Sequence, residues 1–281
     1  MHLQVFPPDP KLAHLFMHIL LVEPEPAGTH LPAGLSPSVM LFVRGAAQVE
    51  QGDGSLLSAY RFFLRGPYLT PMRVVYEPGT VALSVCFRPG MLPRGMGVSV
   101  GEIFSNYLPM QALLAPASVA TFLAGIDAAH TRDEYVGLFQ DFLLTQLDLS
   151  QKKSMGAAFM DAHQKLFFPL IDLALHFGIG RRQLERRVRD TYGVPLRDVR
   201  RIVRFGLSLP HILGQAAARG DLTRIAQDAG YYDQAHMHRE YVEMAGISPL
   251  NLLQKIAGDD PAYWLYRLSQ TDFRNLFLPV E

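Results

Sequence analysis

The chain has 281 residues, of which 49% are hydrophobic, and its formal net charge is zero. This length is typical of two domains, and the composition is sufficient for packed cores. The longest apolar run, residues 12–22, is shorter than the roughly 18 residues that a membrane span needs, and no small-residue cleavage site follows it. Cys86 is the only cysteine, which excludes an intramolecular disulfide. We therefore expect a cytoplasmic protein without a membrane segment, with residues 12–22 as a buried strand or helix.

The neutral total conceals a difference between the two halves. Residues 1–150 contain 8 basic and 12 acidic side chains, whereas residues 151–281 contain 18 and 14. Residues 181–204 contain nine Arg, no Lys and only three acidic residues. Such a block is typical of a surface that binds a polyanion, and the alternative is a solvated helix face with intrahelical ion pairs. The use of Arg alone favours the first interpretation, because Arg suits bidentate contacts with phosphate and guanine.

Short apolar runs between turn signals predict strands in the N-terminal part. Residues 38–45 predict one strand, and residues 51–55 contain an Asp-Gly pair that suits a tight hairpin. Residues 72–90 predict two strands around Pro78-Gly79. In the second of these, Val81, Leu83, Val85 and Phe87 lie on one face and Ala82, Ser84, Cys86 and Arg88 on the other, as in a half-buried strand. Regular short strands of this kind indicate a small β-barrel or sandwich.

Helical spacing of apolar residues begins after about residue 99. Residues 118–130 and 131–147 predict two helices. An apolar stripe on the second is typical of a core-facing surface, with a dimer seam as the alternative. The stripe consists of Tyr135, Leu138, Phe139, Phe142, Leu143 and Leu147. Residues 148–156 are polar and predict a linker to a second, helical domain.

The clearest pattern in that second domain is a pair of short helices around a tight turn. Asp221 predicts the start of the first helix, and Gly230 its end, because glycine tolerates a positive φ. Asp233 and Gly246 bound the second helix in the same way. The residues predicted to face inward are Leu222, Ile225, Ala226 and Ala229 on the first helix, and Met237, Tyr241 and Val242 on the second. This is the outline of a DNA-reading helix-turn-helix.

The second helix contains a His-x-His arrangement, His236 and His238, which raises the alternative of a metal site. Residues two apart do not share a face of a helix, and ligand pairs on helices are usually four apart. We therefore predict that Gln234, His236, His238 and Arg239 project outward toward nucleic acid. Gln and Arg suit the edges of adenine and guanine. No metal and no cofactor are expected.

Residues 170–178 and 181–193 repeat the helix-turn-helix outline. The inward residues of the second helix are predicted to be Leu184, Val188 and Tyr192, and the outward ones Arg181, Arg182, Glu185, Arg186 and Arg189. Glu185 either accepts a hydrogen bond from cytosine or pairs with Arg182 or Arg189 along the helix. A helix over residues 197–215 is predicted to hold the two units apart, with a kink at Pro210.

Residues 170–253 resemble the DNA-binding domain of AraC/XylS-family transcriptional regulators, which has two helix-turn-helix units joined by a long helix. The matching residues are Ile225-Ala226, Ala229-Gly230, Asp233-Gln234, His236, Arg239, Gly246 and Ser248-Pro249. The first unit matches more loosely, since Gly180 stands where the family usually has Ser or Thr. The resemblance implies base contacts, in successive major grooves, by Arg182, Glu185, Arg186, Gln234, Ala235, His236, His238 and Arg239.

The N-terminal half resembles the cupin-like β-barrel sensor domain of such regulators. The resemblance implies an α+β multidomain protein, with a barrel and appended helices over residues 1–150, an all-α domain over 151–258 and an aromatic tail over 259–281. It also implies a regulator rather than an enzyme. The implied partners are double-stranded DNA, a small-molecule effector, RNA polymerase and a second copy of the chain in a homodimer.

The sequence does not identify an effector site. Aromatic side chains in the N-terminal half are candidates for a pocket, with plain core packing as the alternative, and Arg44 and Arg88 are candidates for an anionic effector. The aromatic candidates are Phe62, Phe63, Tyr68, Tyr76 and Phe87. We expect the tail, which contains Trp264, to pack against the sensor domain or a partner subunit.

Two other functions are alternatives to a DNA-binding regulator. A barrel-type small-molecule enzyme with a helical accessory domain requires a nucleophile with a base, or a metal cluster, and Cys86 has no His close to it in sequence. A protein-interaction module would use the basic helices to contact acidic partners. Binding that ignores DNA sequence but follows the charge of the partner would favour this second alternative.

Overall fold

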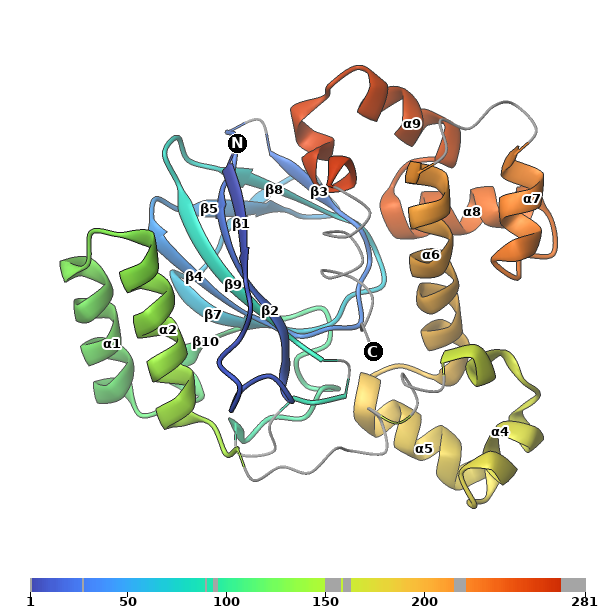
Figure 1. The fold of residues 1–281 in the computed structure, drawn as a ribbon, viewed down its shortest axis with the longest axis horizontal. Helices are drawn as coiled ribbons and strands as arrows, with labels where there is room; N and C mark the ends of the chain where they lie inside the picture. The colour runs from blue at the N-terminus through green and yellow to red at the C-terminus, as the bar shows by residue number, and fades with distance from the viewer. Residues whose placement is uncertain are drawn as a thin grey trace.

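The computed structural model describes residues 2–26, 28–88, 90–92, 96–149, 158, 163–214 and 221–268. A β-rich N-terminal half with two helices is followed by a helical C-terminal half that lies beside it (Figure 1). Most of the predicted linker, residues 150–156, and the end of the predicted tail, residues 269–281, lie outside the described residues.

The strands form two antiparallel sheets. In the six-stranded sheet the order is β1 (His2–Phe6), β2 (Phe16–Glu23), β9 (Val81–Phe87), β4 (Ser38–Arg44), β7 (Phe62–Arg65) and β10 (Tyr107–Pro109). In the four-stranded sheet it is β3 (Thr29–Leu31), β8 (Met72–Tyr76), β5 (Ala47–Glu50) and β6 (Leu56–Ser58). The predicted β-rich half is confirmed, although in the described residues its strands are divided between two sheets and do not close into one barrel.

The turn at Pro78-Gly79 shows how the division arises. The strands on either side of it were predicted correctly, but β8 pairs with β3 and β5, whereas β9 pairs with β2 and β4. The chain therefore crosses from one sheet to the other at this turn, where Gly79 has a positive φ of 74°.

The prediction that β9 is only half-buried is wrong. Val81, Leu83, Val85 and Phe87 belong to a core shared with the helices α1 (Pro116–Ala128) and α2 (Arg132–Gln146). Ala82, on the other face, belongs to a second core that includes the four-stranded sheet. Because β9 lies in the interior of a sheet that is covered on both sides, six of its seven residues are buried and Cys86 is partly buried.

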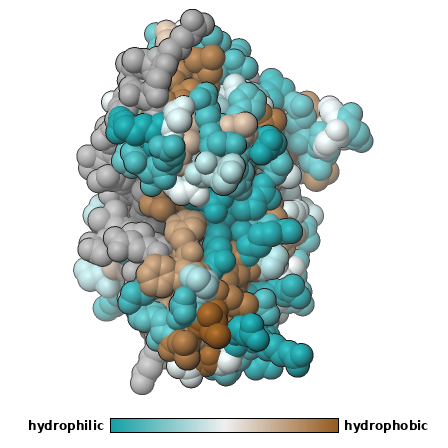
Figure 2. Space-filling model, turned by 90° about the vertical axis from the view of Figure 1, so that its right-hand side faces the viewer, coloured by the Kyte–Doolittle hydropathy of each residue, from teal (hydrophilic) through white to brown (hydrophobic). Residues whose placement is uncertain are grey.

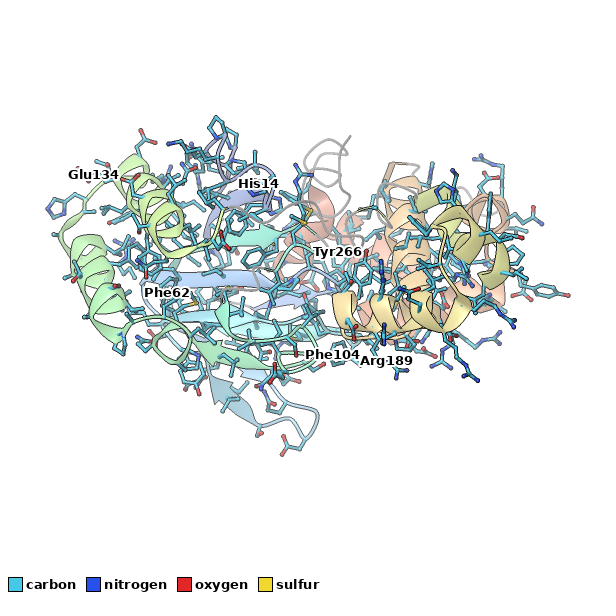
Figure 3. The ribbon with its side chains drawn as sticks, turned by 90° about the horizontal axis from the view of Figure 1, so that it is seen from below. His14, Phe62, Phe104, Glu134, Arg189 and Tyr266 are labelled. Carbon is cyan, nitrogen blue, oxygen red and sulfur yellow. The ribbon has the colours of Figure 1, made fainter. Side chains whose placement is uncertain are left out.

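Helices α1 and α2 cover the outer face of the six-stranded sheet. Thr131 and Glu134 form a capping box at the start of α2. Phe62 of β7 points toward α1 and α2 (Figure 3). It packs against the rings of Phe122 and Phe142, which stack with centroids 4.3 Å apart. The apolar stripe of α2 is thus occupied by the core of its own chain and is not a free dimer seam.

The helical half runs through six α-helices within the described residues. They are α4 (Leu170–His176), α5 (Arg181–Tyr192), α6 (Leu196–Gly214), α7 (Asp221–Asp228), α8 (Gln234–Ala245) and α9 (Pro249–Ala257). Pro210 lies inside α6, which is a single helix from Leu196 to Gly214. No helix in the described part of the chain is both long enough and apolar enough to cross a membrane.

The two halves contact each other through a 3₁₀ segment, η4 (Pro261–Arg267), that packs on β3. Trp264 Nε1 donates to Thr29 Oγ1 at 2.8 Å, and the rings of His30 and Tyr263 stack 4.7 Å apart. The predicted packing of the aromatic tail against the N-terminal half is therefore confirmed for the described part of the tail.

Figure 2 shows the outer side of the helical half. Most of this surface is hydrophilic, and hydrophobic side chains gather toward its lower end. Ile171 and Leu175 of α4 are among the exposed apolar residues of the chain.

Candidate nucleic-acid interface

The first helix-turn-helix unit consists of α4 and α5. Gly178, with a φ of 63°, lies in the turn between the two helices. Gly180 is the N-cap residue of α5 and supplies no side-chain hydrogen bond. The predicted inward residues Leu184, Val188 and Tyr192 are all buried, which confirms the orientation of α5.

The opposite face of α5 is polar and exposed, as predicted. It carries Arg181, Arg182, Glu185, Arg186 and Arg189. Among the described residues none of these five side chains forms an ion pair. The alternative in which Glu185 pairs with Arg182 or Arg189 is thus not realised here, and the face is available to another molecule.

The C-terminal end of α5 lies against the N-terminal half. A Cβ on Gly193, which ends this helix with a φ of 73°, would lie 3.4 Å from the ring of Phe104. Phe104 and Arg189 both lie in this region, where the two halves meet (Figure 3). The orientation of α5 is therefore set by contacts with both halves.

The second unit consists of α7 and α8. Ile225 and Ala226 are buried, and Gly230 has a φ of 78° in the turn, as predicted. Asp233 caps α8 by accepting a hydrogen bond from the backbone N–H of His236 at 2.7 Å. Gly246 ends α8 in the left-handed conformation. The predicted turn at Gly230 and the predicted boundaries of α8 are therefore confirmed, whereas the residues before Asp221, where α7 was predicted to begin, lie outside the described residues.

The inward residues of α8 were predicted correctly with one exception. Met237 and Tyr241 are fully buried, and the Tyr241 hydroxyl lies 2.7 Å from Ser208 Oγ of α6. Val242, however, is 46% exposed, so its predicted inward orientation is wrong. One further residue along a helix rotates the side chain by about 100°, which takes Val242 away from the core that Tyr241 enters.

The outward face of α8 carries four of the predicted residues. Gln234, Ala235, His238 and Arg239 are exposed. Gln234 Oε1 accepts a hydrogen bond from Thr223 Oγ1 of α7 at 3.2 Å, and Asp233 precedes it at the cap. These side chains surround the first turns of the helix, the part that enters the major groove in helix-turn-helix proteins.

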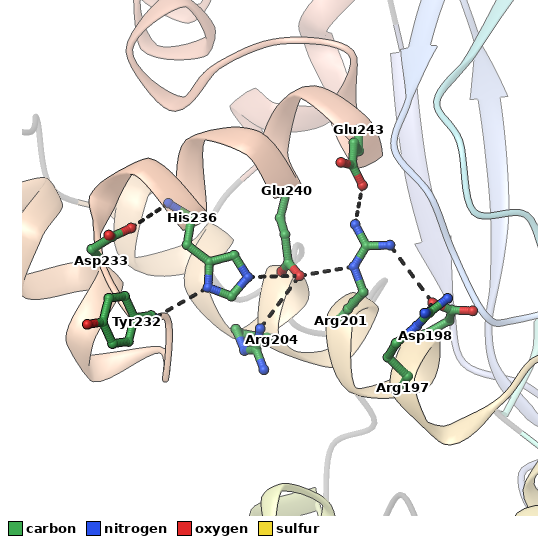
Figure 4. A network of polar contacts seen from close by, with 9 residues as sticks. All are labelled: Arg197, Asp198, Arg201, Arg204, Tyr232, Asp233, His236, Glu240 and Glu243. Atoms are coloured by element: carbon green, nitrogen blue, oxygen red, sulfur yellow. Dashed lines mark hydrogen bonds and ion pairs between the residues drawn. The ribbon is translucent and has the colours of Figure 1, made fainter.

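His236 projects outward less than predicted, because its side chain is only 32% exposed and makes contacts within its own domain. Its Nε2 lies 3.4 Å from Glu240 Oε1, and its Nδ1 lies 3.4 Å from the backbone nitrogen of Tyr232 (Figure 4). The ring of Tyr231 meets the imidazole edge-on, with centroids 5.4 Å apart. The spacing of four residues places His236 beside Glu240 on one side of α8.

Glu240 is the centre of an ion network between α8 and α6 (Figure 4). Its side chain is buried, and its Oε1 lies 3.0 Å from Arg201 Nε and 3.6 Å from Arg204 Nη1. Arg201 also pairs with Glu243 of α8 and, at 3.9 Å, with Asp198 of α6. A buried carboxylate requires such partners, because removing it from water costs several kcal/mol.

This network uses residues that the charge pattern assigned to a polyanion-binding block. Arg201 and Arg204 are engaged with α8, and Arg200 donates to the carbonyl oxygens of Leu166 and Phe168. The interpretation of residues 181–204 as one polyanion-binding block is therefore wrong for these three arginines of α6, whereas Arg181, Arg182, Arg186 and Arg189 of α5 are exposed, as that interpretation requires. The feature of the sequence that could have indicated the contact between His236 and Glu240 is their spacing of four residues on one helix.

The described residues contain no group of three or more His, Cys, Asp or Glu side chains arranged to hold a metal ion. Cys86 is partly buried on β9, and burial raises the pKa of its thiol, so the thiol is protonated at neutral pH.

Residues 173–255 match the helix-turn-helix domain family of the AraC type. The chain thus contains an AraC-type helix-turn-helix domain, and the resemblance noted in the sequence is confirmed over these residues. A comparison of the sequence with curated proteins gives no match.

Among solved structures, ToxT from Vibrio cholerae is 9% identical, with 90% of this chain and 98% of that chain covered and a TM-score of 0.47. ToxT of Vibrio cholerae strain SCE256 with a bound unsaturated fatty acid is 9% identical, with coverages of 89% and 94% and a TM-score of 0.45. The AraC-like transcriptional activator CuxR is 18% identical, with coverages of 66% and 71% and a TM-score of 0.26.

Proposed function

We propose that this protein is a sequence-specific DNA-binding transcriptional regulator that reads two successive major grooves with α5 and α8. The observation that carries the proposal is an AraC-type domain in which the second helix of each unit exposes its polar face. Its apolar face is buried in both units, so the polar face is the surface left for DNA.

The polar faces of α5 and α8 suit different kinds of contact with DNA. On α5, Arg181, Arg182, Arg186 and Arg189 provide four positive charges that suit phosphates and guanines, and Glu185 suits the amino group of cytosine. On α8, Arg239 suits guanine and Gln234 suits adenine, with His238 and Ala235 beside them. His236 contacts Glu240 of the same helix, and Glu240 in turn pairs with Arg201 and Arg204 of α6, so His236 serves recognition by supporting the residue that positions α8.

We also propose a role for each of the two domains and two further partners. Residues 151–258 bind DNA, and residues 1–150 respond to a small-molecule effector. A second copy of the chain and RNA polymerase are further partners. Because the stripe on α2 is filled by the core, a dimer contact would use another surface.

Selection of genomic fragments by the purified full chain, at near-physiological salt, tests the proposal, since phosphate contacts make affinity strongly salt-dependent. We expect a motif of two boxes about 10 base pairs apart, one helical turn. Selection by an Arg239→Ala variant should keep the box read by α5 and lose information in the box read by α8.

The matched control is Arg132→Ala, which removes the same charge from the N-terminal half, where Arg132 pairs with Glu23. This variant should recover the wild-type motif. The wild type is tested both with and without cell extract, which serves as a source of effector. If the recovered fragments share no motif under either condition, sequence-specific recognition is contradicted. Binding that follows charge alone would favour the protein-interaction alternative.

A further inference from the structure

A pocket of about 600 Å³ opens beside both sheets and reaches the helical half. This volume lies within the roughly 300–1,000 Å³ typical of small-molecule sites. Its lining includes Arg65, Tyr68, Met72, Tyr107 and, from the C-terminal end of α8, Gly246. The pocket therefore touches a recognition helix as well as the sheets.

Arg65 at the end of β7 is the distinctive group in this pocket. Strand register places it beside Ser38 of β4 and Tyr107 of β10, and Ser38 is in turn beside Cys86 of β9. Residues that are direct partners across strands share a face, so this polar row lies on the face opposite to α1 and α2. Arg65 Nε donates to Ser38 Oγ at 3.1 Å, and its guanidinium lies over the Tyr68 ring, 4.9 Å from the centroid.

The positive charge of Arg65 has no carboxylate partner within the described residues. Its neighbours do not supply a negative charge at neutral pH. Burial raises the pKa of Tyr68 and Tyr107, and it raises the pKa of Tyr76 to about 12, so these hydroxyls stay neutral. The Cys86 thiol is protonated for the same reason.

The other titratable groups that line the pocket are balanced or neutral. Arg73 Nη1 and Glu50 Oε2 pair at 2.6 Å. Burial, and then the charge of Arg73, lowers the pKa of His30, which favours its neutral form. One uncompensated positive charge, that of Arg65, therefore remains in a partly buried pocket, where charge-assisted hydrogen bonds are stronger than in water.

We propose that this pocket binds a small monocarboxylate with an apolar body. The carboxylate accepts hydrogen bonds from the Arg65 guanidinium, which has donors left after its bond to Ser38. The apolar body packs on Tyr68, Tyr107 and Met72. One charge on the ligand balances the one unpaired charge of the pocket.

The pocket is also placed to influence α8. Gly246 has a φ of 72°, and a Cβ on it would lie 3.2 Å from Pro71 Cγ, so α8 ends directly against the pocket wall. The backbone N–H of Ala33 donates to the carbonyl of Met244 at 2.7 Å in the same region. A ligand here would alter the seating of α8, and this regulatory consequence, unlike the binding itself, rests on the proposed DNA-binding function.

Binding can be tested without DNA by a matched pair of probes, 3-phenylpropionate and its neutral amide. The fluorescence of Trp264, the only tryptophan, reports on the contact between the halves and is read together with the thermal unfolding midpoint. We expect the wild type to bind the acid at least about tenfold more tightly than the amide, a charge-assisted preference.

Arg65→Gln should abolish this preference while Arg65→Lys retains part of it. Arg44→Gln is the matched control, because Arg44 is an exposed strand arginine that donates to the Gly79 carbonyl and does not line the pocket. Equal binding of acid and amide to the wild type, no binding of either, or an unchanged preference in a folded Arg65→Gln variant would each overturn the proposal. A binding preference without any effect on DNA affinity would leave the site intact and contradict only its regulatory consequence.

Discussion

The two helix-turn-helix units have the same outline but are stabilised by different interactions. The second helix of the first unit, α5, begins at Gly180 without a side-chain cap and packs through apolar side chains. The second helix of the other unit, α8, begins at Asp233, which caps it, and places Glu240 among the arginines of α6. The charged side chains of α5 are thereby left for a ligand, whereas part of the charge around α8 is used to hold the helix in place.

The comparison shows that a basic block in a sequence can contain two kinds of arginine. Arg182 and Arg186 of α5 are exposed and form no ion pair within the described chain. Arg201 and Arg204 of α6, the next helix along the chain, are bound to carboxylates of α8. The first unit should therefore depend on charge for binding, and the second should depend on charge for its stability as well.

The largest expected effect is on stability. Glu240→Ala should lower the free energy of unfolding by about 3–5 kcal/mol, because Arg204 would lose its carboxylate partner in a partly buried site. Urea denaturation followed by circular dichroism measures this change. Glu185→Ala, which removes an exposed carboxylate from α5, should change stability by less than about 0.5 kcal/mol. Similar values for the two variants would contradict the distinction between the units.

A smaller effect is expected on DNA binding by the second unit. Arg239→Ala should weaken binding to the selected motif by about 1–3 kcal/mol and relax specificity at one base pair. Fluorescence anisotropy with motif and scrambled duplexes measures both quantities. An equal loss on the two duplexes would mean that Arg239 contacts phosphate and does not read a base.

The N-cap residues of the two helices can be changed in opposite directions, by removing the side-chain cap of α8 and by adding one to α5. Asp233→Ala should destabilise the protein by about 1 kcal/mol, because the backbone N–H of His236 loses its acceptor. Gly180→Ser should stabilise it by a few tenths of a kcal/mol, since φ at Gly180 is −72° and a Cβ there meets no atom within 4 Å. If Gly180→Ser instead destabilises the protein, the absence of a side-chain cap is not the only difference between the start of α5 and the start of α8.

The smallest expected change is in the salt dependence of binding. Arg186→Ala should reduce the slope of log affinity against log salt by about one if this side chain contacts phosphate. Anisotropy titrations at several salt concentrations measure the slope, with Arg132→Ala as a charge-matched control that should leave it unchanged. An unchanged slope with lost specificity would instead assign Arg186 to base reading.

Much of the helical half could be predicted from residue patterns. Gly178, Gly193, Gly230 and Gly246 take positive φ values at turns or helix ends, and these conformations depend on local chain geometry. The burial of Met237 and similar residues follows from the period of a helix. The outward side chains of α5 were correct for the same reason.

The candidate site was predicted less completely than the helices. The orientation of His236 depends on Glu240, whose burial in turn depends on arginines about 40 residues earlier in the chain. Arg44 and Arg88, the predicted candidates for an anionic effector, donate to backbone carbonyls of Gly79 and Ala13. Arg65 was missed because nothing in its local sequence shows that its neighbours lack a negative charge.

The sequence by itself determined the helix boundaries, the buried faces of the helices and the presence of an AraC-type domain, because caps, glycines and apolar periods act over a few residues. The tertiary structure alone decided the division of the strands into two sheets, the use of Arg201 for holding α8, and the pocket around Arg65. Each of these depends on segments that are distant in the chain and adjacent in the fold, and the energy of a buried charge is set by every group that surrounds it.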